Sequence, residues 1–423
     1  MSSKMLLIFC DGTGMDGALA ESRAITNTSR SAAGNLNTVS ENSSAPDITS
    51  SEIPVRGSEG GKQFASNVLR LSRSVKSSTA GGKRQIVFYQ SGVGSETNFK
   101  GDPADGTTWQ QAFGTAVASK IRDVYAFVAQ NFEDGDEICI FGFSRGAYTA
   151  RKVSGLIDRI GLLERKQLGR FFQIWRQLVD GETPTIPPGT RHPRIKCVGV
   201  WDTVGSVLGT IDALDIKDTS LPATIDIALH ALSLQENRER FLPTLWSVPK
   251  GGLPTNQSLK QVWFAGAHSD VGGGYELADI ALFWMAGEIE SFVDLDLEFL
   301  ESARQQKPDP WGTSQPHNAY MDLPLTQRIV IGHKTRLQSE QISPDSVFHE
   351  SLKYSPQSLV SSDYMVTLSL LEEAFGPKFQ PDYPPLNEFE YQCKERWSKT
   401  PIGLPEPPPI FDDPGDIIRS PVN

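Results

Sequence analysis

A serine lies between two glycines where a predicted strand ends and a predicted helix begins. Residues 142–146, Gly-Phe-Ser-Arg-Gly, fit the G-x-S-x-G pattern of a nucleophile elbow, in which the glycines permit a sharp turn and raise the serine above a sheet. The apolar run 137–141 precedes this turn, and apolar residues at helical spacing follow it over 150–160. This context favours Ser144 as a nucleophile. The alternative is a serine that only caps the helix.

A nucleophilic serine needs a base and an acid, and in this type of fold the acid and then the histidine follow it along the chain. His268 ends the apolar run QVWFAGAH and precedes the glycine-containing loop SDVGGGY, so it is the predicted base, although a single histidine is more often a structural residue. Asp202 ends the run IKCVGVWD and is the predicted acid. Asp270 and Asp279 follow the histidine and fit the order less well. An Asp202 that only caps the next turn is the alternative interpretation.

Two backbone N–H groups are needed to bind the oxyanion of an acyl transfer. The Arg145 N–H lies at the predicted helix N-terminus, where negative charge is favoured. The second donor is predicted at Gly12 or Thr13, in the loop DGTG after the first strand, because small residues let the backbone approach a substrate oxygen. Asp11 either braces this loop or lines the substrate site. A phosphate-binding loop is the rival interpretation, but the chain lacks the pattern G-x-x-x-x-G-K-[ST] there.

The elements that hold these residues alternate between short apolar runs and helical periodicity, which is typical of an α/β protein. Helices are predicted around 121–128 and 150–160, and the run DIALHALSL, which contains His230, is interpreted as helical. Strands are predicted at 5–10, 85–89, 137–141, 195–201 and 261–265. The prediction is an α/β-hydrolase fold, with a mostly parallel central sheet covered by helices on both faces and with cap-like insertions.

Composition and position divide the chain further. Residues 1–292 are the predicted catalytic domain, interrupted by a Ser/Gly-rich insertion over 15–62, and residues 293–423 are a Pro-rich extension or annex. Residues 206–260 are a cap candidate, because apolar residues between the acid and the base could cover an acyl chain. Within it, Leu229, Phe241 and Leu245 are candidates to line the substrate site. The alternative is that these side chains are simply core packing.

The acidic composition limits the partners. A formal net charge of -11 and a pI near 5.2 argue against nucleic acid and against electrostatic docking on anionic lipid, so any peripheral membrane contact would be apolar and local. The four cysteines lack metal-ligand spacing and are expected to be reduced and buried, and neither a metal nor an organic cofactor is expected. No signal peptide or membrane span is apparent, since no window approaches about 18 apolar residues. A cytoplasmic protein is therefore expected.

Ordered blocks of sequence resemble the α/β-hydrolase domain family that includes bacterial type VI secretion phospholipase effectors. The blocks cover roughly residues 4 to 290 and read FCDGTG, SNVLRL, IVFYQSGVG, FGFSRGAYTAR, VGVWDTVGSVLG, HALSLQENRERFLPTLW and VWFAGAHSDVGGGYELADIALFWM. In that family the serine of GFSRG, the aspartate of VWDTVG and the histidine of HSDVGGG form a triad. The resemblance implies that Ser144, Asp202 and His268 do so here.

Together these inferences predict a serine ester hydrolase that works through an acyl-enzyme on small-molecule or lipid esters, as a phospholipase does. Two alternatives stay open. One is a non-catalytic scaffold that binds a partner or ligand on a hydrolase fold. The other is an acyltransferase, in which an alcohol or amine replaces water in the second step.

Overall fold

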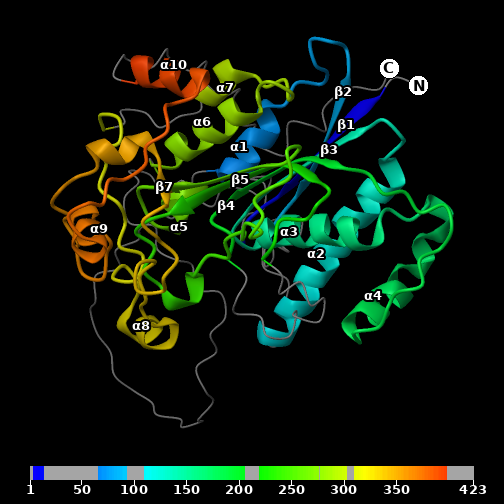
Figure 1. Cartoon of the computed structure of the whole chain (residues 1–423), viewed down its shortest axis with the longest axis horizontal. Helices are drawn as coiled ribbons and strands as arrows, with labels where there is room; N and C mark the ends of the chain where they lie inside the picture. The colour runs from blue at the N-terminus through cyan, green and yellow to red at the C-terminus, as the bar shows by residue number, and fades with distance from the viewer. Residues whose placement is uncertain are drawn as a thin grey trace, which may run out of the picture.

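A parallel β-sheet forms the centre of the computed structural model, which describes residues 3–13, 65–92, 109–204, 219–275, 277–302 and 309–397 (Figure 1). The sheet has seven strands in the order β2-β1-β3-β4-β5-β6-β7, and every neighbouring pair is parallel. The predicted α/β fold is confirmed. The strands are β1 Lys4–Cys10, β2 Arg84–Gln90, β3 Glu137–Phe143, β4 Ile195–Trp201, β5 Ile225–Ser233, β6 Ser258–Phe264 and β7 Val347–Phe348.

Helices cover both faces of this sheet (Figure 1). The helices α2, α3 and α4 lie on one face, and α1, α6, α7 and α10 lie on the other. The described helices are α1 Asn67–Ser74, α2 Trp109–Asn131, α3 Ser144–Ile160, α4 Phe171–Val179, α5 His268–Gly272, α6 Ala278–Ile289, α7 Leu297–Ser302, α8 Leu325–Ile331, α9 Leu368–Phe375 and α10 Glu388–Arg396.

Each face of the sheet has its own apolar core. In β1, Leu6 and Ile8 pack with the α2 and α3 side, whereas Leu7 and Phe9 pack with the α1 and α6 side. Successive side chains of a strand point to opposite faces, so a strand buried on both faces is a continuous apolar run in the sequence. Strands β1, β3 and β4 follow this pattern, whereas β2 and β6, which were also predicted, are partly exposed.

The predicted helix around His230 is wrong, because residues 225–233 form the inner strand β5 between β4 and β6. Residues 228–233 of this strand are all buried. Leu229 packs in the core with Trp201 and Met285. This is the core packing that the sequence left open as the alternative to a role in lining the substrate site. A short apolar run that is buried on every side carries no period that separates a strand from a helix.

The segment after α7 adds to the sheet and to the core. Its strand β7 pairs with β6, where no strand was predicted. A third apolar cluster joins Trp263 of β6 to residues of this segment, among them Phe348, Leu352 and Leu371. The predicted insertion over 15–62 and the first part of the cap candidate, 206–218, lie outside the described residues.

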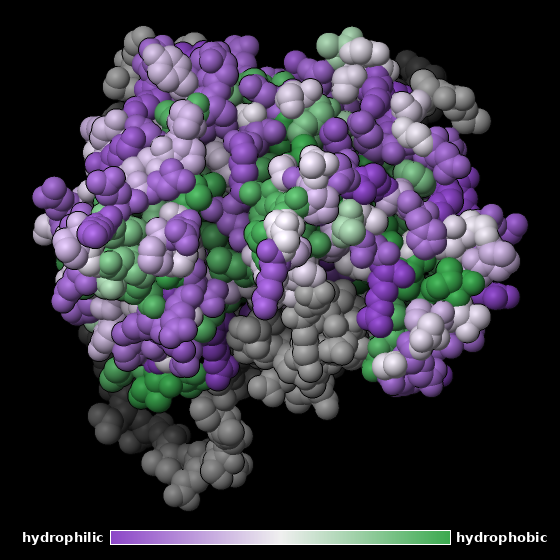
Figure 2. Space-filling view, viewed as in Figure 1, coloured by the Kyte–Doolittle hydropathy of each residue, from purple (hydrophilic) through white to green (hydrophobic). Residues whose placement is uncertain are grey.

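The surface seen in Figure 2 is largely hydrophilic, with small apolar patches. One patch at the lower left of the view lies over α8, and three side chains of α8, Leu325, Ile329 and Val330, are exposed. None of the described helices has the length and hydrophobicity needed to cross a bilayer. All four cysteines are buried thiols, as predicted.

A buried polar contact holds α10 against the residues after β7. His349 Nε2 lies 2.6 Å from Glu390 Oε1, and Glu390 Oε2 accepts a hydrogen bond from the Asn387 N–H in a capping box. We expect Glu390→Ala to lower the free energy of unfolding by about 3 kcal/mol, because the buried His349 loses its partner and α10 loses part of its cap.

Urea unfolding followed by tryptophan fluorescence would measure this loss. Glu388→Ala is the matched control, since Glu388 is exposed in the same helix, and its expected effect is below about 0.5 kcal/mol. Equal destabilisation by the two substitutions would show that the buried contact does not hold the helix.

Candidate active site

Ser144 begins α3 directly after β3, at the carboxyl edge of the sheet. Its φ is 57°, in the left-handed region that is unfavourable for a residue with a side chain. The helix has Phe143 at its N-cap and no side-chain capping hydrogen bond, so Ser144 does not serve as the cap. The turn needs its glycines: a Cβ on Gly142 would lie 2.5 Å from the Gly146 oxygen, and one on Gly146 would lie 2.1 Å from the Cys10 oxygen. The geometry is that of a strained strand-to-helix turn carrying a serine.

Asp202 follows β4 directly and is fully buried. Its Oδ2 lies 2.6 Å from His268 Nδ1, and its Oδ1 accepts a hydrogen bond from the Ser233 N–H. Burial opposes ionisation of Asp202, but the Arg336 guanidinium and the hydrogen bond from His268 outweigh it and hold the pKa of the carboxyl well below its usual range. Asp202 is therefore an ionised carboxylate bonded to a histidine, and its contacts go beyond capping a turn.

His268 is the first residue of α5 and is only 4% exposed. Its ring lies between those of Phe143 and Phe241, with centroids at 4.6 Å and 5.1 Å. Burial lowers the pKa of His268, although Asp202 opposes this, so the ring is neutral at pH 7. With Nδ1 donating to the carboxylate, Nε2 carries the lone pair, and this buried atom has no hydrogen-bond partner among the described residues. Such a nitrogen can accept a proton.

The loop after β1 lies beside Ser144. A Cβ on Gly12 would lie 3.4 Å from the Ser144 Cβ and 2.8 Å from the Phe143 ring, so only glycine fits here without a shift. Thr13 Oγ1 accepts a hydrogen bond from Arg145 Nη1 at 2.7 Å, which ties the loop to α3.

The Asp11 carboxylate stabilises this loop through hydrogen bonds. Its Oδ1 accepts from the Gly12 N–H at 2.7 Å, and its Oδ2 accepts from the hydroxyls of Ser66 and Tyr89, each at 2.6 Å. Of the two roles left open by the sequence, bracing is the one that these contacts support. Because the Gly12 N–H already donates to Asp11, this predicted oxyanion donor is engaged within the loop.

The two other candidate acids are bonded elsewhere. Asp270 Oδ1 lies 2.6 Å from His317 Nδ1, and its Oδ2 accepts from the Ala267 N–H. Asp279 forms an ion pair with Arg70 at 2.6 Å. Asp202 is thus the candidate acid whose carboxylate contacts the ring of His268.

Two residues that the sequence did not single out also contact His268 or its neighbours. The buried Glu236 accepts from the His268 N–H through Oε2 and from Arg238 through both carboxylate oxygens. The Arg238 guanidinium stacks on Phe241 at 3.6 Å, so the candidate lining residue Phe241 does lie at this site. Leu245 instead packs against the core cluster of β6 and β7. A turn of the form Glu-x-Arg has no pattern that marks it as part of a site.

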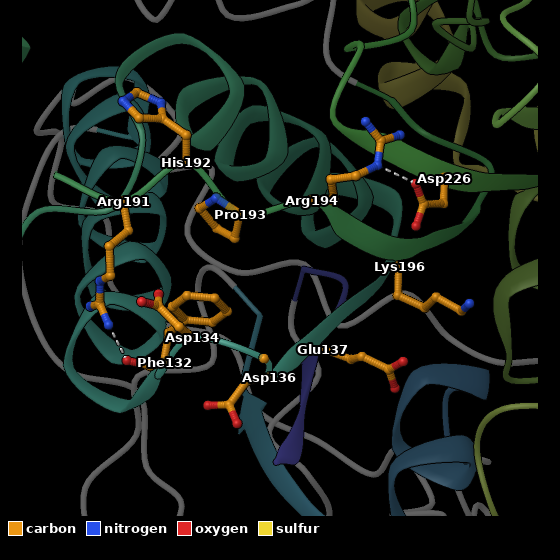
Figure 3. Close-up of a pocket in the computed structure, with 11 residues that line it drawn as sticks. Phe132, Asp134, Asp136, Glu137, Arg191, His192, Pro193, Arg194, Lys196 and Asp226 are labelled. Atoms are coloured by element: carbon orange, nitrogen blue, oxygen red, sulfur yellow. Dashed lines mark hydrogen bonds and ion pairs between the residues drawn. The ribbon is translucent and has the colours of Figure 1, made fainter.

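A surface pocket of about 360 Å³ lies at the opposite edge of the sheet (Figure 3). Glu137, Lys196 and Asp226 line it from the amino-terminal parts of three strands, and Arg194 pairs with Asp226 at 2.6 Å. The seven residues of β3 separate this pocket from Ser144 by about 20 Å, at about 3.3 Å per residue. The pocket therefore does not belong to the candidate active site. No cluster of metal-ligating side chains is present among the described residues.

Comparisons with known proteins give partial matches. An uncharacterized protein of Saccharomyces cerevisiae is 27% identical over 212 residues, which cover 43% of this chain and 30% of that protein. A crystal structure of an uncharacterized protein from Pseudomonas aeruginosa matches with 16% identity and a TM-score of 0.35, over 68% of this chain and 45% of that one. A structure of the Tle1 effector bound to the VgrG spike matches with 19% identity and a TM-score of 0.31, over 65% of this chain and 51% of that one.

The chain spans between about a third and a half of the length of these proteins. The catalytic domain of the T6SS phospholipase effectors of the Tle1-like type matches residues 55–288, more than half of the chain. This match includes Ser144, Asp202 and His268 and agrees with the resemblance of the sequence blocks. The chain therefore belongs to the family of the Tle1-like catalytic domain of T6SS phospholipase effectors.

Proposed function

We propose that this protein is a serine ester hydrolase that acts on acyl esters of lipids, with Ser144 as nucleophile, His268 as base and Asp202 as the orienting acid. The observation that carries the proposal is the 2.6 Å contact between Asp202 Oδ2 and His268 Nδ1, which leaves the lone pair of a buried Nε2 available. The strained serine at the start of α3 adjoins Phe143, whose ring packs on that histidine.

In the first half of the reaction, Ser144 Oγ attacks the ester carbonyl carbon while His268 Nε2 takes the hydroxyl proton. The Asp202 carboxylate holds the ring and stabilises the imidazolium that forms. Collapse of the tetrahedral intermediate breaks the bond to the leaving alcohol, which receives the proton from His268. The product is an acyl-enzyme on Ser144.

In the second half, His268 takes a proton from water, and the resulting hydroxide attacks the acyl carbonyl carbon. Collapse of this intermediate releases the fatty acid, and the proton on His268 returns to Ser144 Oγ. If an alcohol or amine enters in place of water, the same steps give acyl transfer.

The oxyanion of both intermediates needs N–H donors that are not already engaged. The Arg145 N–H belongs to the first turn of α3, where the N–H groups point toward the N-terminal end of the helix and favour negative charge. The Gly12 N–H donates to Asp11 within the loop, so the Thr13 N–H is the proposed second donor.

Two apolar features support a lipid substrate. The ring of Phe241 packs on His268, where an acyl chain could contact it. The backbone after α8 is joined to the turn that carries Phe241, through Lys334 N to Asn237 O at 3.0 Å and Glu239 N to Gly332 O at 3.1 Å. The exposed apolar side chains of α8 therefore lie on a segment fixed to the rim of the site.

A chain-length series tests the substrate class. We expect kcat/KM for p-nitrophenyl esters to rise several-fold for each pair of added carbons up to medium chains, because each buried methylene contributes up to about 0.8 kcal/mol. Vesicles of diacyl phosphatidylcholine should release fatty acid. Competing alcohols in the assay separate acyl transfer from hydrolysis by their ester products. A sharp optimum at acetyl esters, with no fatty acid from the vesicles, would exclude a lipid substrate while leaving the triad intact.

A further inference from the structure

A buried arginine from the segment after α8 contacts the candidate acid. Arg336 is 0% exposed, and its Nη2 donates to Asp202 Oδ2 at 3.0 Å, to Asp202 Oδ1 at 3.3 Å and to Ser233 Oγ at 3.1 Å. Ser233 in turn donates its N–H to Asp202 Oδ1. Besides His268, the carboxylate is thus held by two residues, Arg336 and Ser233, that also contact each other.

The backbone around Arg336 is held in place for this contact. Thr335 and Gln338 exchange hydrogen bonds between their side chains and main chains, and the Arg336 carbonyl accepts from Gln341 N and Ser339 Oγ. Burying a guanidinium is costly unless its charge is paired. Nε and Nη1 of Arg336 are buried without a hydrogen-bond partner among the described residues. The contacts of Nη2 with Asp202 and Ser233 therefore offset the cost of burying the guanidinium.

The buried charges around His268 are balanced in sign. Asp202 and Glu236 are the carboxylates, and Arg336 and Arg238 are the guanidiniums, so two negative groups are matched by two positive ones. Burial lowers the pKa of Arg336, while Asp202 and Glu236 act to raise it. Without Arg336, the buried ring would face an excess negative charge, which favours the protonated imidazolium and removes the base.

We infer that Arg336 is a positioning residue for the reaction proposed above: it holds the Asp202 carboxylate on His268 Nδ1 and offsets its negative charge, so that the histidine stays an unprotonated base. The inference rests on the proposed function. It also means that the C-terminal segment 309–397, which lies beyond the region matched by the family, completes the candidate active site.

The pH profile of kcat/KM is the measurement that separates this role from a structural one. Burial places the pKa of His268 below the ordinary value of 6.5, so the acid limb of the intact enzyme should lie below that pH. The other groups that face the pair are Glu236 and Arg238, and His230, whose pKa burial lowers to about 3 so that it stays neutral in this range. Asp270 is bonded to His317. The expected shift is therefore assigned to Arg336.

Arg336→Met removes the charge and keeps much of the volume. We expect the acid limb to move to higher pH by about one to three units. The positive charge of Arg336, which disfavours protonation of His268, has been lost beside the Asp202–His268 pair. The plateau of kcat/KM should fall about 10- to 100-fold, because hydrogen bonds to a charged group have been lost. Arg336→Lys restores the charge without the planar geometry, so its acid limb should return toward that of the intact enzyme.

Arg194→Met is the matched control, since it breaks the Arg194–Asp226 pair at the opposite edge of the sheet, and it should change neither quantity. The position of the acid limb does not depend on the folded fraction, and circular dichroism of each variant reports folding separately. If Arg336→Met does not fold, Arg336→Gln, which also removes the charge, decides through its pH profile. An acid limb that stays in place, with a plateau lowered only by the folded fraction, would overturn the inference. Turnover that persists in Ser144→Ala would instead overturn the proposed function.

Discussion

Replacing Ser144 by alanine is expected to lower kcat/KM for a medium-chain ester by about four orders of magnitude or more. The substitution removes the attacking oxygen, and His268 and Asp202 cannot act on the ester without it. Alanine keeps the Cβ that is already accommodated at a φ of 57°, so the backbone strain stays the same and the free energy of unfolding should change by less than about 1 kcal/mol.

Ser154→Ala is the matched control for this prediction. Ser154 lies in the same helix, and its hydroxyl donates to the Arg151 carbonyl within that helix. Its removal should leave kcat/KM within about threefold of the intact enzyme, since the hydroxyl has no contact with the site. Wild-type turnover by Ser144→Ala, in a preparation without contaminating esterase, would falsify the assignment of the nucleophile.

Asp202→Asn is expected to lower kcat by about three to four orders of magnitude while leaving measurable activity. The carboxylate accepts a hydrogen bond from His268 Nδ1 and so keeps Nε2 unprotonated. An amide nitrogen at this position would donate to Nδ1 and favour the tautomer with a proton on Nε2, which cannot act as the base. The buried Arg336 would also lose the charge that pairs with it.

Asp270→Asn provides the comparison, because Asp270 is also buried and also bonded to a histidine, His317. Its expected effect on kcat is less than about tenfold, since it does not touch the ring of His268. Thermal melting of both variants shows how much of each loss comes from unfolding. If Asp270→Asn proved far more damaging to kcat than Asp202→Asn, the acid would have been assigned to the wrong residue.

The sequence was sufficient to predict much of the central sheet and the place in the sheet of three candidate site residues. Strands β1, β3 and β4 are apolar runs that end at polar or small residues, and parallel strands bring their carboxyl ends to one edge. Asp202 and His268 could therefore be placed together before any contact was known. β5 could not be identified, because seven of its nine residues are buried and such a run has no diagnostic period, and the two residues of β7 are too few to form a pattern.

The contacts that complete the site have no local signature. Arg336 lies 134 residues from Asp202 along the chain, in a segment whose prolines suggested only an extension or annex. Glu236, which accepts a hydrogen bond from the His268 N–H, lies in the turn after β5, and β5 was predicted as a helix. The engagement of the Gly12 N–H by its neighbour Asp11 depends on the loop conformation, and the residue types alone do not determine it.

A second set of serine, histidine and carboxylate shows why contacts alone do not identify a nucleophile. Ser351 Oγ lies 2.9 Å from His349 Nδ1, and His349 Nε2 lies 2.6 Å from Glu390. Ser351 is 2% exposed and belongs to a short 3-10 helix, without the strained strand-to-helix turn of Ser144. It should not react with an added electrophile.

Labelling with a serine-directed fluorophosphonate, followed by mass spectrometry of the intact chain and of its tryptic peptides, is the most direct test that Ser144 is an activated nucleophile. The proposed triad predicts one adduct per chain on the peptide that contains Ser144, no adduct in Ser144→Ala, and much slower labelling in His268→Ala. No adduct on the folded protein, while a known serine hydrolase in the same tube is labelled, would contradict the triad and favour a non-catalytic scaffold. An adduct on another serine, such as Ser351, would contradict it equally.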